Sequence, residues 1–573
     1  MTEYFEVIHR DGAARIGKLE GYYTPCIINP KAYFPKYQIM PPYHARKEII
    51  EYFYKKSGYF GNGKVVHPKY PELSLRNDQL PIVIIGCANQ LEKNARELVE
   101  SIINIREKIP PDTALYAPAL ATPENLSMLI YIGVDLVDTT LPIILAYQDI
   151  YLTKDGDFKI NTLHDFPCEC SVCKDVKVTD LQKMPKIERA ELLSKHNCVK
   201  LEEELKLCKE KIFEGTLREY VEKQCRAKPW LTATLRLIDF NYNYLEKRTP
   251  IARNSVMFAN SMESMFRVEI QRFADRVLNR YKPPELDTLV LLPCSAKKPY
   301  SKSVSHKKFI NAIGKSRKYL HEVIITSPLG IVPRELERTY PAAHYDVAVT
   351  GYWDYEERNW VIECLYKYLI KNKNYKYIIA HVDGAYEDIV KSVEKKLKEK
   401  YEKSERELEF IYTNSLENLS KAVENTLHIP SRGNLKLLTI HSTMRSIADY
   451  QFGAGFGEIL IPDSAKIKRH QIIERKKNKL IATLVPQYGL LALTLEGGRI
   501  LKEFGSYGIK IENFIPKGSI LAPGVIDADQ QIRPRDEVFF ENEKVFGVGR
   551  AKMSGWEMVK SNRGIAVDVR DKE

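Results

Sequence analysis

Apolar and polar positions divide the chain into regions of different periodicity. In the first region, short apolar runs such as 82–85 and 114–118 alternate with a helical stretch at 90–105. Short apolar runs bounded by turn residues are typical of strands, and their alternation with helices predicts a β/α barrel or a doubly wound sheet. A Lys- and Glu-rich helical stretch at 201–223 leads into aromatic-rich helices. We therefore expect an α/β domain over 1–230 and a helical connector over 231–283.

A second alternating region follows the connector. Apolar runs at 288–292, 322–326 and 377–382, together with a charged helical stretch at 386–406, predict a compact α/β domain over 284–425.

The remaining chain changes character twice. Residues 434–490 are expected to form a small α+β domain. From 491 to 573, short strands separated by Gly, Pro and Asp predict a small β-barrel. The fold class is thus a multidomain α/β protein that includes a β-barrel.

Composition narrows the class of protein. With 573 residues, several separate cores are expected. No signal-peptide pattern and no apolar run long enough to span a membrane is present, so we expect a cytoplasmic protein. The net charge of +12 favours an anionic partner such as nucleic acid, although thermal adaptation also produces Lys- and Glu-rich surfaces. Ten cysteines are too sparse for a disulfide scaffold, and their clustering suggests metal binding or catalysis.

The densest group of reactive side chains follows the apolar run 286–292. It reads Pro293-Cys-Ser-Ala-Lys-Lys-Pro-Tyr-Ser-Lys-Ser-Val-Ser-His306. Cys294 then lies just past a strand end, where α/β sheets place ligand sites. An isolated cysteine there is more often an inert core residue, but Lys297, Lys298 and His306 favour a thiolate. Cys294 is therefore a candidate nucleophile. Asp383 also follows a strand end, where an ordinary turn aspartate is an equal alternative.

Three closely spaced cysteines indicate a metal site. Cys168-Glu-Cys170-Ser-Val-Cys173 is followed by Lys195-His196-Asn197-Cys198. Three thiolates and one imidazole satisfy a closed tetrahedral site for structural Zn²⁺. We expect Cys168, Cys170, Cys173 and His196 to be the ligands, with Cys198 as a further candidate.

Two aspartates mark another strand, in Gly133-Val-Asp135-Leu-Val-Asp138. Alternation along the strand is expected to direct both carboxylates to the same side of a strand end. In a barrel that edge is the active face. Ordinary turn aspartates would give the same pattern.

These features together resemble archaeal tRNA-guanine transglycosylases. Residues 5–19 look like the first hairpin of that family, residues 133–138 look like the strand that carries its aspartate nucleophile, and the Cys₃His pattern is similar to its zinc site. The resemblance implies that Asp138 takes the nucleophile's place and that Asp135 and Asp138 could retain base binding. Because a complete eight-fold barrel needs about 250 residues, a partial barrel is expected here.

The end of the chain strongly resembles a PUA domain, a small barrel that binds structured RNA. The match lies in Leu521-Ala-Pro-Gly-Val-Ile-Asp-Ala-Asp529 and in Val548-Gly-Arg-Ala-Lys-Met-Ser-Gly555. Positive side chains in this region can meet phosphates, and a solvated basic face is the alternative. The candidate RNA-binding residues are Arg533, Arg535, Arg550, Lys552 and Arg563.

The middle region resembles the segment that sets archaeosine synthases apart from transglycosylases. Besides residues 293–306, it contains Ser327-Pro-Leu-Gly-Ile-Val-Pro-Arg and Tyr345-Asp-Val-Ala-Val-Thr-Gly-Tyr-Trp-Asp354. The resemblance implies a transferase of nitrogenous groups that acts on tRNA carrying 7-cyano-7-deazaguanine in its D-loop. It further implies that the nitrile is converted towards the formamidine of archaeosine.

A mechanism follows from this substrate. A nitrile carbon is a poor electrophile, so a covalent thioimidate on Cys294 would lower the barrier. We expect His306 or Asp383 to protonate the imine nitrogen, and Lys297 to lower the thiol pKa or to position phosphate. The amine donor stays open between glutamine or ammonia and lysine, the latter with a radical-SAM partner enzyme. A homodimer is expected by resemblance.

Two rival functions remain at this level. A transglycosylase would exchange the base through Asp138, with the middle domain as a scaffold. A non-catalytic tRNA-binding factor would use a decayed barrel and a PUA domain without chemistry.

Overall fold

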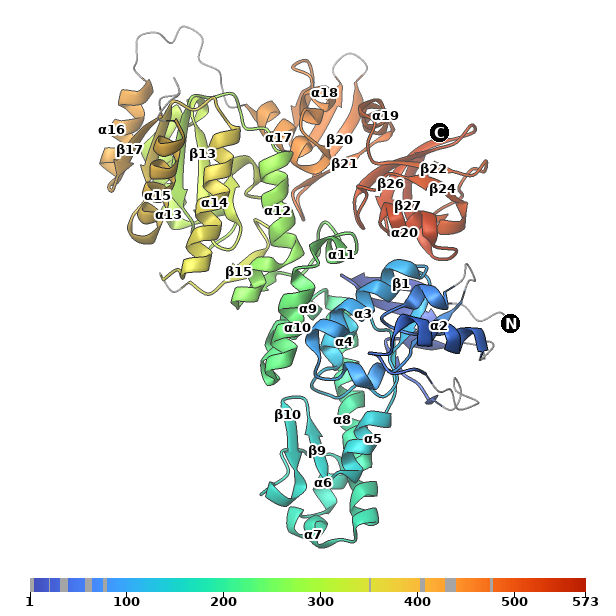
Figure 1. Cartoon of the computed structure of the whole chain (residues 1–573). Helices are drawn as coiled ribbons and strands as arrows, with labels where there is room; N and C mark the ends of the chain where they lie inside the picture. The colour runs from blue at the N-terminus through green and yellow to red at the C-terminus, as the bar shows by residue number, and fades with distance from the viewer. Residues whose placement is uncertain are drawn as a thin grey trace. The chain divides into compact units, whose positions relative to one another are not determined.

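The computed structural model describes residues 5–19, 21–30, 40–56, 64–75, 80–349, 352–401, 408–427, 439–474 and 478–573. The chain forms two compact units (Figure 1). Residues 1–250, 520–525 and 553–566 make up the first, and residues 251–519, 526–552 and 567–573 make up the second. No helix among the described residues is long and apolar enough to cross a membrane.

The first unit begins with an antiparallel sheet and continues with a parallel one. Strands β1 (Phe5–Asp11), β2 (Ala14–Leu19) and β3 (Tyr22–Thr24) pair in that order. Gly12 has φ +63° in the β1–β2 turn, a conformation that costs glycine little. The parallel sheet has the order β4-β8-β7-β6-β5. Its strands are β4 (Cys26–Ile27), β5 (Lys64–Val66), β6 (Ile82–Ile85), β7 (Ala114–Tyr116) and β8 (Leu136–Val137).

Helices alternate with most of these parallel strands along the chain. Helices α2 (Lys47–Lys56), α3 (Ala95–Lys108) and α4 (Leu126–Tyr131) lie between successive strands, and α5 (Thr140–Tyr147) follows β8. Ile82, Ile84, Tyr116 and Leu136 are buried in one core cluster of this sheet. The βα alternation and the five parallel strands agree with the partial barrel expected from the sequence.

A small hairpin and a long helix form the part of this unit that carries the clustered cysteines. The hairpin is β9 (Ile150–Thr153) and β10 (Gly156–Lys159), followed by α6 (Ser171–Asp175) and α7 (Val178–Lys183). Helix α8 (Lys186–Glu214) spans 29 residues, about 44 Å, and ends at Gly215 with φ +69°. Helices α9 (Leu217–Gln224), α10 (Pro229–Asp239) and α11 (Tyr242–Glu246) complete the helical stretch.

The second unit opens with β11 (Met257–Ala259) and α12 (Val268–Asn279). Its main sheet has the order β14-β13-β12-β16-β17. Strands β12 (Thr288–Pro293), β13 (His321–Thr326), β16 (Tyr377–His381) and β17 (Glu409–Thr413) are parallel, and β14 (Gly330–Pro333) is antiparallel to β13. Strand β15 (Tyr345–Val347) pairs with β11 instead. The three strands expected in this region are therefore confirmed.

Helices cover this sheet because its strands are apolar on both faces. Helices α13 (Val304–Ile313) and α16 (Leu416–Leu427) bury Phe309 and Leu419 against Val290 and Leu292. Leu289 and Leu291, which point to the opposite face, are also fully buried. Helices α14 (Tyr355–Lys371) and α15 (Gly384–Tyr401) pack against each other.

Two further sheets follow. Helices α17 (Ile440–Phe452) and α18 (Phe456–Leu460) precede an antiparallel sheet in the order β18-β19-β20-β21. Its strands are β18 (Lys466–Lys468), β19 (Gln471–Glu474), β20 (Lys479–Val485) and β21 (Leu490–Leu493). This is an α+β arrangement, as expected, although the boundary placed at 434 lies outside the described residues.

Helix α19 (Leu495–Phe504) leads into the last sheet, whose order is β23-β27-β26-β25-β22-β24. Its strands are β22 (Gly508–Ile511), β23 (Ile520–Leu521), β24 (Val525–Ala528), β25 (Glu537–Glu541), β26 (Phe546–Ala551) and β27 (Ile565–Lys572), with α20 (Gly555–Lys560) between the last two. At Gly549 a Cβ would come within 2.3 Å of the Asp568 carbonyl oxygen, so glycine permits β26 and β27 to pair closely.

Candidate functional site

Cys294 lies at the position where this type of sheet binds ligands. It follows directly after β12, the central strand. From β12 the chain crosses to β13 on one side, and β16 lies on the other side and leads outward to β17. In open α/β sheets, ligands bind outside the carboxyl ends of the strands where the strand order reverses in this way. The register pairs Leu291 with Ala380, so Cys294 and Asp383 both follow three residues later.

The thiol of Cys294 has a tyrosine as its direct neighbour. Its Sγ lies 3.0 Å from Oη of Tyr386, which belongs to the first turn of α15. The Tyr386 ring packs edge-on against Trp353, with 4.8 Å between ring centroids. Burial raises the pKa of Tyr386, and the nearby thiol raises it further. The phenol therefore remains protonated at neutral pH and can donate a hydrogen bond to the sulfur.

The basic neighbour of the thiol is Lys298 rather than Lys297. Lys297 is exposed, whereas Lys298 is half-buried with its Nζ 4.0 Å above the ring of Tyr345. Burial lowers the pKa of Lys298, while negative charge on Cys294 and Asp346 opposes that shift. The Tyr345 hydroxyl in turn lies 2.6 Å from that of Tyr300. A partly desolvated ammonium group thus faces the thiol and aromatic rings.

His306 is held by the protein through both ring nitrogens. Its Nε2 lies 3.0 Å from the Pro293 carbonyl oxygen, and its Nδ1 lies 3.0 Å from Nη2 of Arg334. Burial lowers the pKa of His306 to about 4, and Arg334 adds to the effect. A neutral ring that donates to a carbonyl and accepts from a guanidinium has no proton left for a substrate. This geometry favours a structural role for His306 over the acid role expected from the sequence.

Asp383 and Tyr386 both follow the end of β16, but the sequence pointed only to Asp383 as a site residue. Asp383 is exposed, and its negative charge contributes to the raised pKa of Tyr386. Tyr386 follows it by three residues and was not recognised, although the same strand-end argument applies to it. Trp353 was also not assigned a role, because its proximity to Tyr386 depends on how the loops fold over the sheet.

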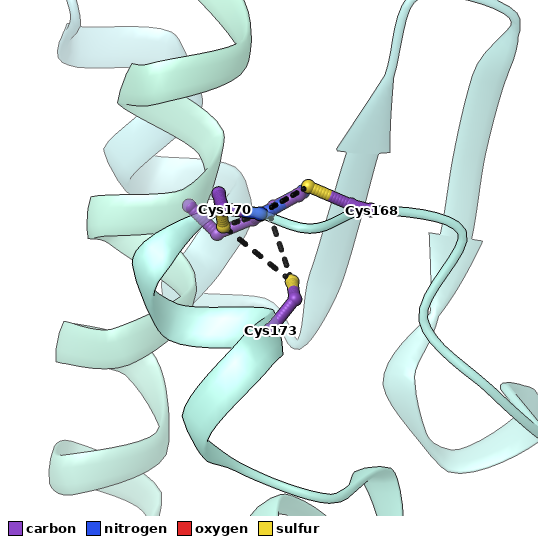
Figure 2. Close-up of side chains that lie close together, drawn as sticks. Cys168, Cys170 and Cys173 are labelled. Carbon is purple, nitrogen blue, oxygen red and sulfur yellow. Dashed lines mark hydrogen bonds between the residues drawn. The ribbon is translucent and has the colours of Figure 1, made fainter.

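The four expected metal ligands converge in the first unit. Figure 2 shows the three cysteines of this group close together. The sulfur atoms of Cys168, Cys170 and Cys173 and a ring nitrogen of His196 all lie within 4.8 Å of one another. Sγ of Cys170 is 3.6 Å from Sγ of Cys173 and 3.4 Å from Nδ1 of His196. Ligands bound to zinc at about 2.0–2.3 Å in a tetrahedron are roughly 3.5–3.8 Å apart, so this donor set fits the ion.

The surroundings hold the histidine in a ligand-competent form. Its Nε2 lies 2.9 Å from the Leu152 carbonyl oxygen, which leaves Nδ1 directed at the thiols. Burial lowers the pKa of His196 to about 4, so the ring is neutral at pH 7. The ring of Tyr151 stacks on it at 3.8 Å between centroids. Cys198 does not belong to the cluster, and its side chain hydrogen-bonds with Thr139 instead.

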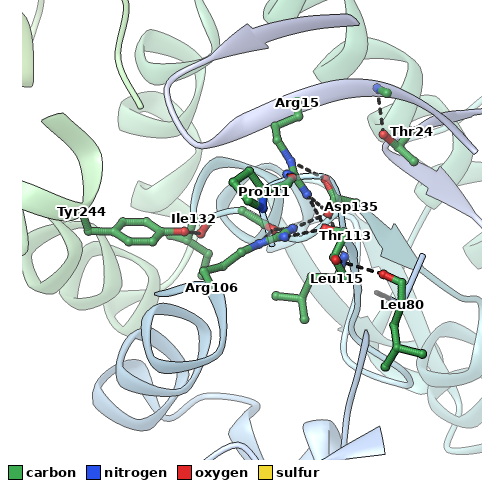
Figure 3. A network of polar contacts seen from close by, with 12 residues as sticks. Arg15, Thr24, Leu80, Arg106, Pro111, Thr113, Leu115, Ile132, Asp135 and Tyr244 are labelled. Carbon is green, nitrogen blue, oxygen red and sulfur yellow. Dashed lines mark hydrogen bonds and ion pairs between the residues drawn. The ribbon is translucent and has the colours of Figure 1, made fainter. Parts of the chain in front are cut away.

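The two aspartates around β8 do not face one side together, so that expectation is wrong. Asp135 precedes β8 and Asp138 follows it. The Asp135 carboxylate accepts hydrogen bonds from Nε and Nη2 of Arg15 at 3.1 and 2.6 Å. It also accepts one from Nη2 of Arg106 (Figure 3). Burial alone would raise the pKa of Asp135, but Arg106 and Arg15 outweigh burial and lower it. The two residues are three positions apart, an odd separation that directs them to opposite faces of a strand.

Asp138 is buried, and both of its carboxylate oxygens accept hydrogen bonds. Its Oδ2 accepts from Oη of Tyr116 at 2.5 Å and from the backbone N–H of Ala119 at 3.0 Å. Its Oδ1 accepts from the N–H of Thr140 at 2.7 Å. Only 1% of the residue is exposed, so the carboxylate has no open side for a substrate in this arrangement.

The basic residues expected to meet RNA differ in accessibility. Nη1 of Arg535 donates to the Ala252 carbonyl at 2.7 Å, and Nε of Arg550 lies 3.6 Å from Glu537. Nη1 of Arg533 donates to the Gln530 carbonyl at 2.6 Å. Lys552 pairs with Asp568 at 2.8 Å on the surface, and Arg563 is exposed. Lys552 and Arg563 are therefore the more accessible members of this group.

Comparison with known protein families agrees with the order of these regions. A family described as queuine tRNA-ribosyltransferase matches residues 72–229, and the patch-forming domain C2 of tRNA-guanine transglycosylase matches residues 442–507. A PUA domain matches residues 510–572, and a domain of unknown function matches residues 270–423. Cys294 thus lies in the region whose family has no described function.

Similarity to individual proteins extends over the whole chain. The archaeosine synthase subunit alpha of Methanosarcina acetivorans is 44% identical, and the alignment covers 100% of this chain and 99% of that protein. The archaeosine synthase of Haloferax volcanii is 38% identical over 100% of both. The tRNA-guanine(15) transglycosylase of Methanothermobacter thermautotrophicus is 28% identical over 91% of this chain and 77% of that protein. On the strength of these full-length matches, the chain belongs to the archaeosine synthase family.

Proposed function

We propose that this protein adds an amine to the nitrile of 7-cyano-7-deazaguanine in the D-loop of tRNA, with Cys294 as the nucleophile. The observation that carries the proposal is the pair of Cys294 and Tyr386, 3.0 Å apart at the carboxyl edge of the sheet. Membership of the archaeosine synthase family supplies the reaction class, and the PUA domain supports tRNA as the substrate.

In the first step the sulfur of Cys294 attacks the nitrile carbon. A C–S bond forms, the C≡N bond becomes C=N, and the nitrogen takes up one proton. Tyr386 is suited to relay that proton, because its phenol can give its own proton to the nitrogen and receive the thiol proton. The product of the step is a thioimidate. Lys298, half-buried and electrostatically coupled to Cys294, can stabilise the negative charge that develops on the sulfur as its proton passes to Tyr386.

In the second step an amine attacks the thioimidate carbon. A C–N bond forms, the C–S bond breaks, and the sulfur regains a proton. The amine must lose one proton, and Asp383, exposed at the same edge, is the candidate to accept it. The net result is an amidine, which is archaeosine itself if the donor is ammonia. Lys297, also exposed, is better placed to position a phosphate than to act on the thiol.

The donor and the partner enzyme belong to the proposal. Glutamine or ammonia would complete archaeosine directly, whereas lysine would require a radical-SAM partner to cleave the adduct. The relative from Methanosarcina acetivorans is named a subunit alpha, which supports a partner subunit. Either donor makes the protein a transferase of nitrogenous groups. We further propose a homodimer and a cytoplasmic location.

The remaining regions have supporting roles in this scheme. A zinc ion held by Cys168, Cys170, Cys173 and His196 would stabilise the segment between α5 and α8, because four protein ligands leave no open position for catalysis. The barrel region over 1–230 and the PUA region over 491–573 would hold the tRNA, with Arg533, Arg535, Arg550, Lys552 and Arg563 near phosphates. The connector (231–283), the middle domain (284–425) and the α+β domain (434–490) lie between them in sequence.

Base exchange through Asp138 is the second candidate. The match of residues 72–229 to the queuine tRNA-ribosyltransferase family favours it. The three hydrogen bonds on the buried Asp138 carboxylate count against a nucleophilic role. Asp135, buried and paired with two arginines, is an equally poor candidate for base binding.

One experiment distinguishes these functions. Nitrile-bearing tRNA is incubated with the protein and with ammonia, glutamine or lysine, and the nucleoside is analysed by mass spectrometry. We expect a mass gain at the nitrile that requires Cys294 and is lost in Cys294→Ala. Exchange of labelled guanine would favour the transglycosylase, and an unchanged nucleoside would leave only a binding protein. Normal modification by Cys294→Ala would rule out the thioimidate.

A further inference from the structure

The segment that carries Cys294 also carries an uninterrupted excess of positive charge. Between Thr288 and His321 there are eight Lys and Arg residues and no Asp or Glu. Helix α15 of the same domain is different, because residues 384–401 hold five lysines together with four acidic residues. The charge of the first segment is therefore local and does not follow from the basic composition of the chain as a whole.

Most of these eight side chains are exposed and have no acidic partner among the described residues. Lys302, Lys307, Lys308 and Lys315 are all exposed, and no ion pair joins any of them to a carboxylate of the described chain. The nearest acid in sequence, Glu322, is occupied by Arg317 and Arg334. On α15, by contrast, Lys391 pairs with Glu387 and Lys398 pairs with Glu394, each at 2.6 Å.

The fold ties this basic segment to the thiol. The Ser303 hydroxyl caps α13 by accepting the N–H of His306, and the His306 ring lies 3.0 Å from the carbonyl oxygen of Pro293, next to Cys294. The first turn of α13 is thereby fixed to the end of β12. Its ten residues extend about 15 Å from that edge. The exposed lysines thus follow the reactive group closely along the chain: Lys302 precedes α13, Lys307 and Lys308 lie on it, and Lys315 follows it.

We propose that Lys302, Lys307, Lys308 and Lys315 form a phosphate-binding surface for the tRNA strand that flanks the modified base. These residues lie on α13 or within two residues of its ends and are here called the α13 lysines. The inference rests on the proposed function, since it takes tRNA as the substrate. A base must leave its stack to reach Cys294, and contacts to neighbouring phosphates would hold the distorted strand in place. Exposed ammonium groups without internal partners suit this task, because they bind phosphates without breaking an ion pair. The middle domain then binds RNA itself and does not depend on the PUA domain alone.

The test compares two fourfold Lys→Gln variants of the full-length protein. The first replaces the α13 lysines, and the matched control replaces Lys391, Lys395, Lys398 and Lys400 of α15. Affinity for tRNA is measured over a range of salt concentrations. Each phosphate contact contributes about 0.7 to the slope of log affinity against log salt, so four contacts lower its magnitude by about three. At physiological salt the affinity should fall roughly 100-fold, while the control keeps the wild-type slope.

Turnover separates binding from chemistry. We expect the α13 variant to have a higher KM for tRNA and the wild-type kcat at saturating tRNA. Alkylation of Cys294 at the wild-type rate would show that the sheet edge around the thiol is intact. A slope equal to that of the wild type, or an equal decrease in the control, would overturn the inference. A wild-type protein that binds tRNA with the expected slope but leaves the nitrile unchanged would refute the proposed function and not this surface.

Discussion

Replacement of Tyr386 by Phe gives the sharpest test of the chemistry. The change removes only the hydroxyl that lies 3.0 Å from Sγ of Cys294 and keeps the ring that packs against Trp353. If the phenol relays the proton to the nitrile nitrogen, kcat should fall about 100- to 10,000-fold, the usual contribution of a positioned acid. That range corresponds to about 3–5 kcal/mol of barrier. The cost in folding stability should be only about 1 kcal/mol, that of one hydrogen bond.

The assay is single-turnover conversion of nitrile-bearing tRNA at saturating amine. Burial raises the pKa of Tyr386 above its usual value near 10, so the phenol stays protonated at high pH. Deprotonation of Tyr386 should therefore cause no loss of activity below about pH 10. Tyr355→Phe serves as the matched control, because Tyr355 is 75% exposed at the start of α14. A Tyr386→Phe enzyme within about threefold of wild type, or an equal loss in the control, would refute the relay.

Three further predictions concern stability and metal binding. Asp135→Asn should cost about 3–5 kcal/mol in urea denaturation, because it leaves Arg15 and Arg106 buried without their carboxylate, while Asp155→Asn on the surface should cost little. The lowered pKa of Asp135 means that its contribution is present above about pH 4 and is lost as the pH falls further; a stability of Asp135→Asn equal to that of wild type would contradict this reasoning. The purified protein should contain one zinc ion per chain by elemental analysis, lost in Cys170→Ser and retained in Cys198→Ser; zinc retention in Cys170→Ser would exclude the ligand set. Because the pKa of His306 falls from 6.5 to about 4 on folding, wild type should lose about 3 kcal/mol of stability as the pH falls between these values, and a His306→Gln variant that shows the same loss would contradict the assignment.

Much of the domain order followed from local sequence patterns. The strands at 288–293, 321–326 and 377–381 were recognisable because a buried parallel strand needs a continuous apolar run. The cysteine cluster was recognisable for a similar reason, since three of its four ligands lie within six residues. Its fourth ligand needed only one additional helix, α8, to bring His196 to the thiols.

The side chains around Cys294 were harder to predict because they come from distant segments. Tyr386 lies 92 residues away in sequence, and the β12–β16 pairing brings the two strand ends together. The exposure of Lys297 and the burial of Lys298 depend on how one loop folds, which a pair of adjacent lysines does not reveal. The sequence suggested an acid role for His306 because it does not show which groups contact the ring nitrogens. In the structure those groups are the Pro293 carbonyl and the Arg334 guanidinium.

The sequence by itself therefore determined the apolar strands, the thiol at a strand end, the metal ligands and the resemblance to a family. Each of these features depends on residues that are close to one another along the chain. Only the tertiary structure decided that Asp135 pairs with two buried arginines, that Asp138 accepts three hydrogen bonds and that Tyr386 faces Cys294. Those outcomes depend on which charges and donors burial brings together, and burial is a property of the packed chain rather than of any one segment.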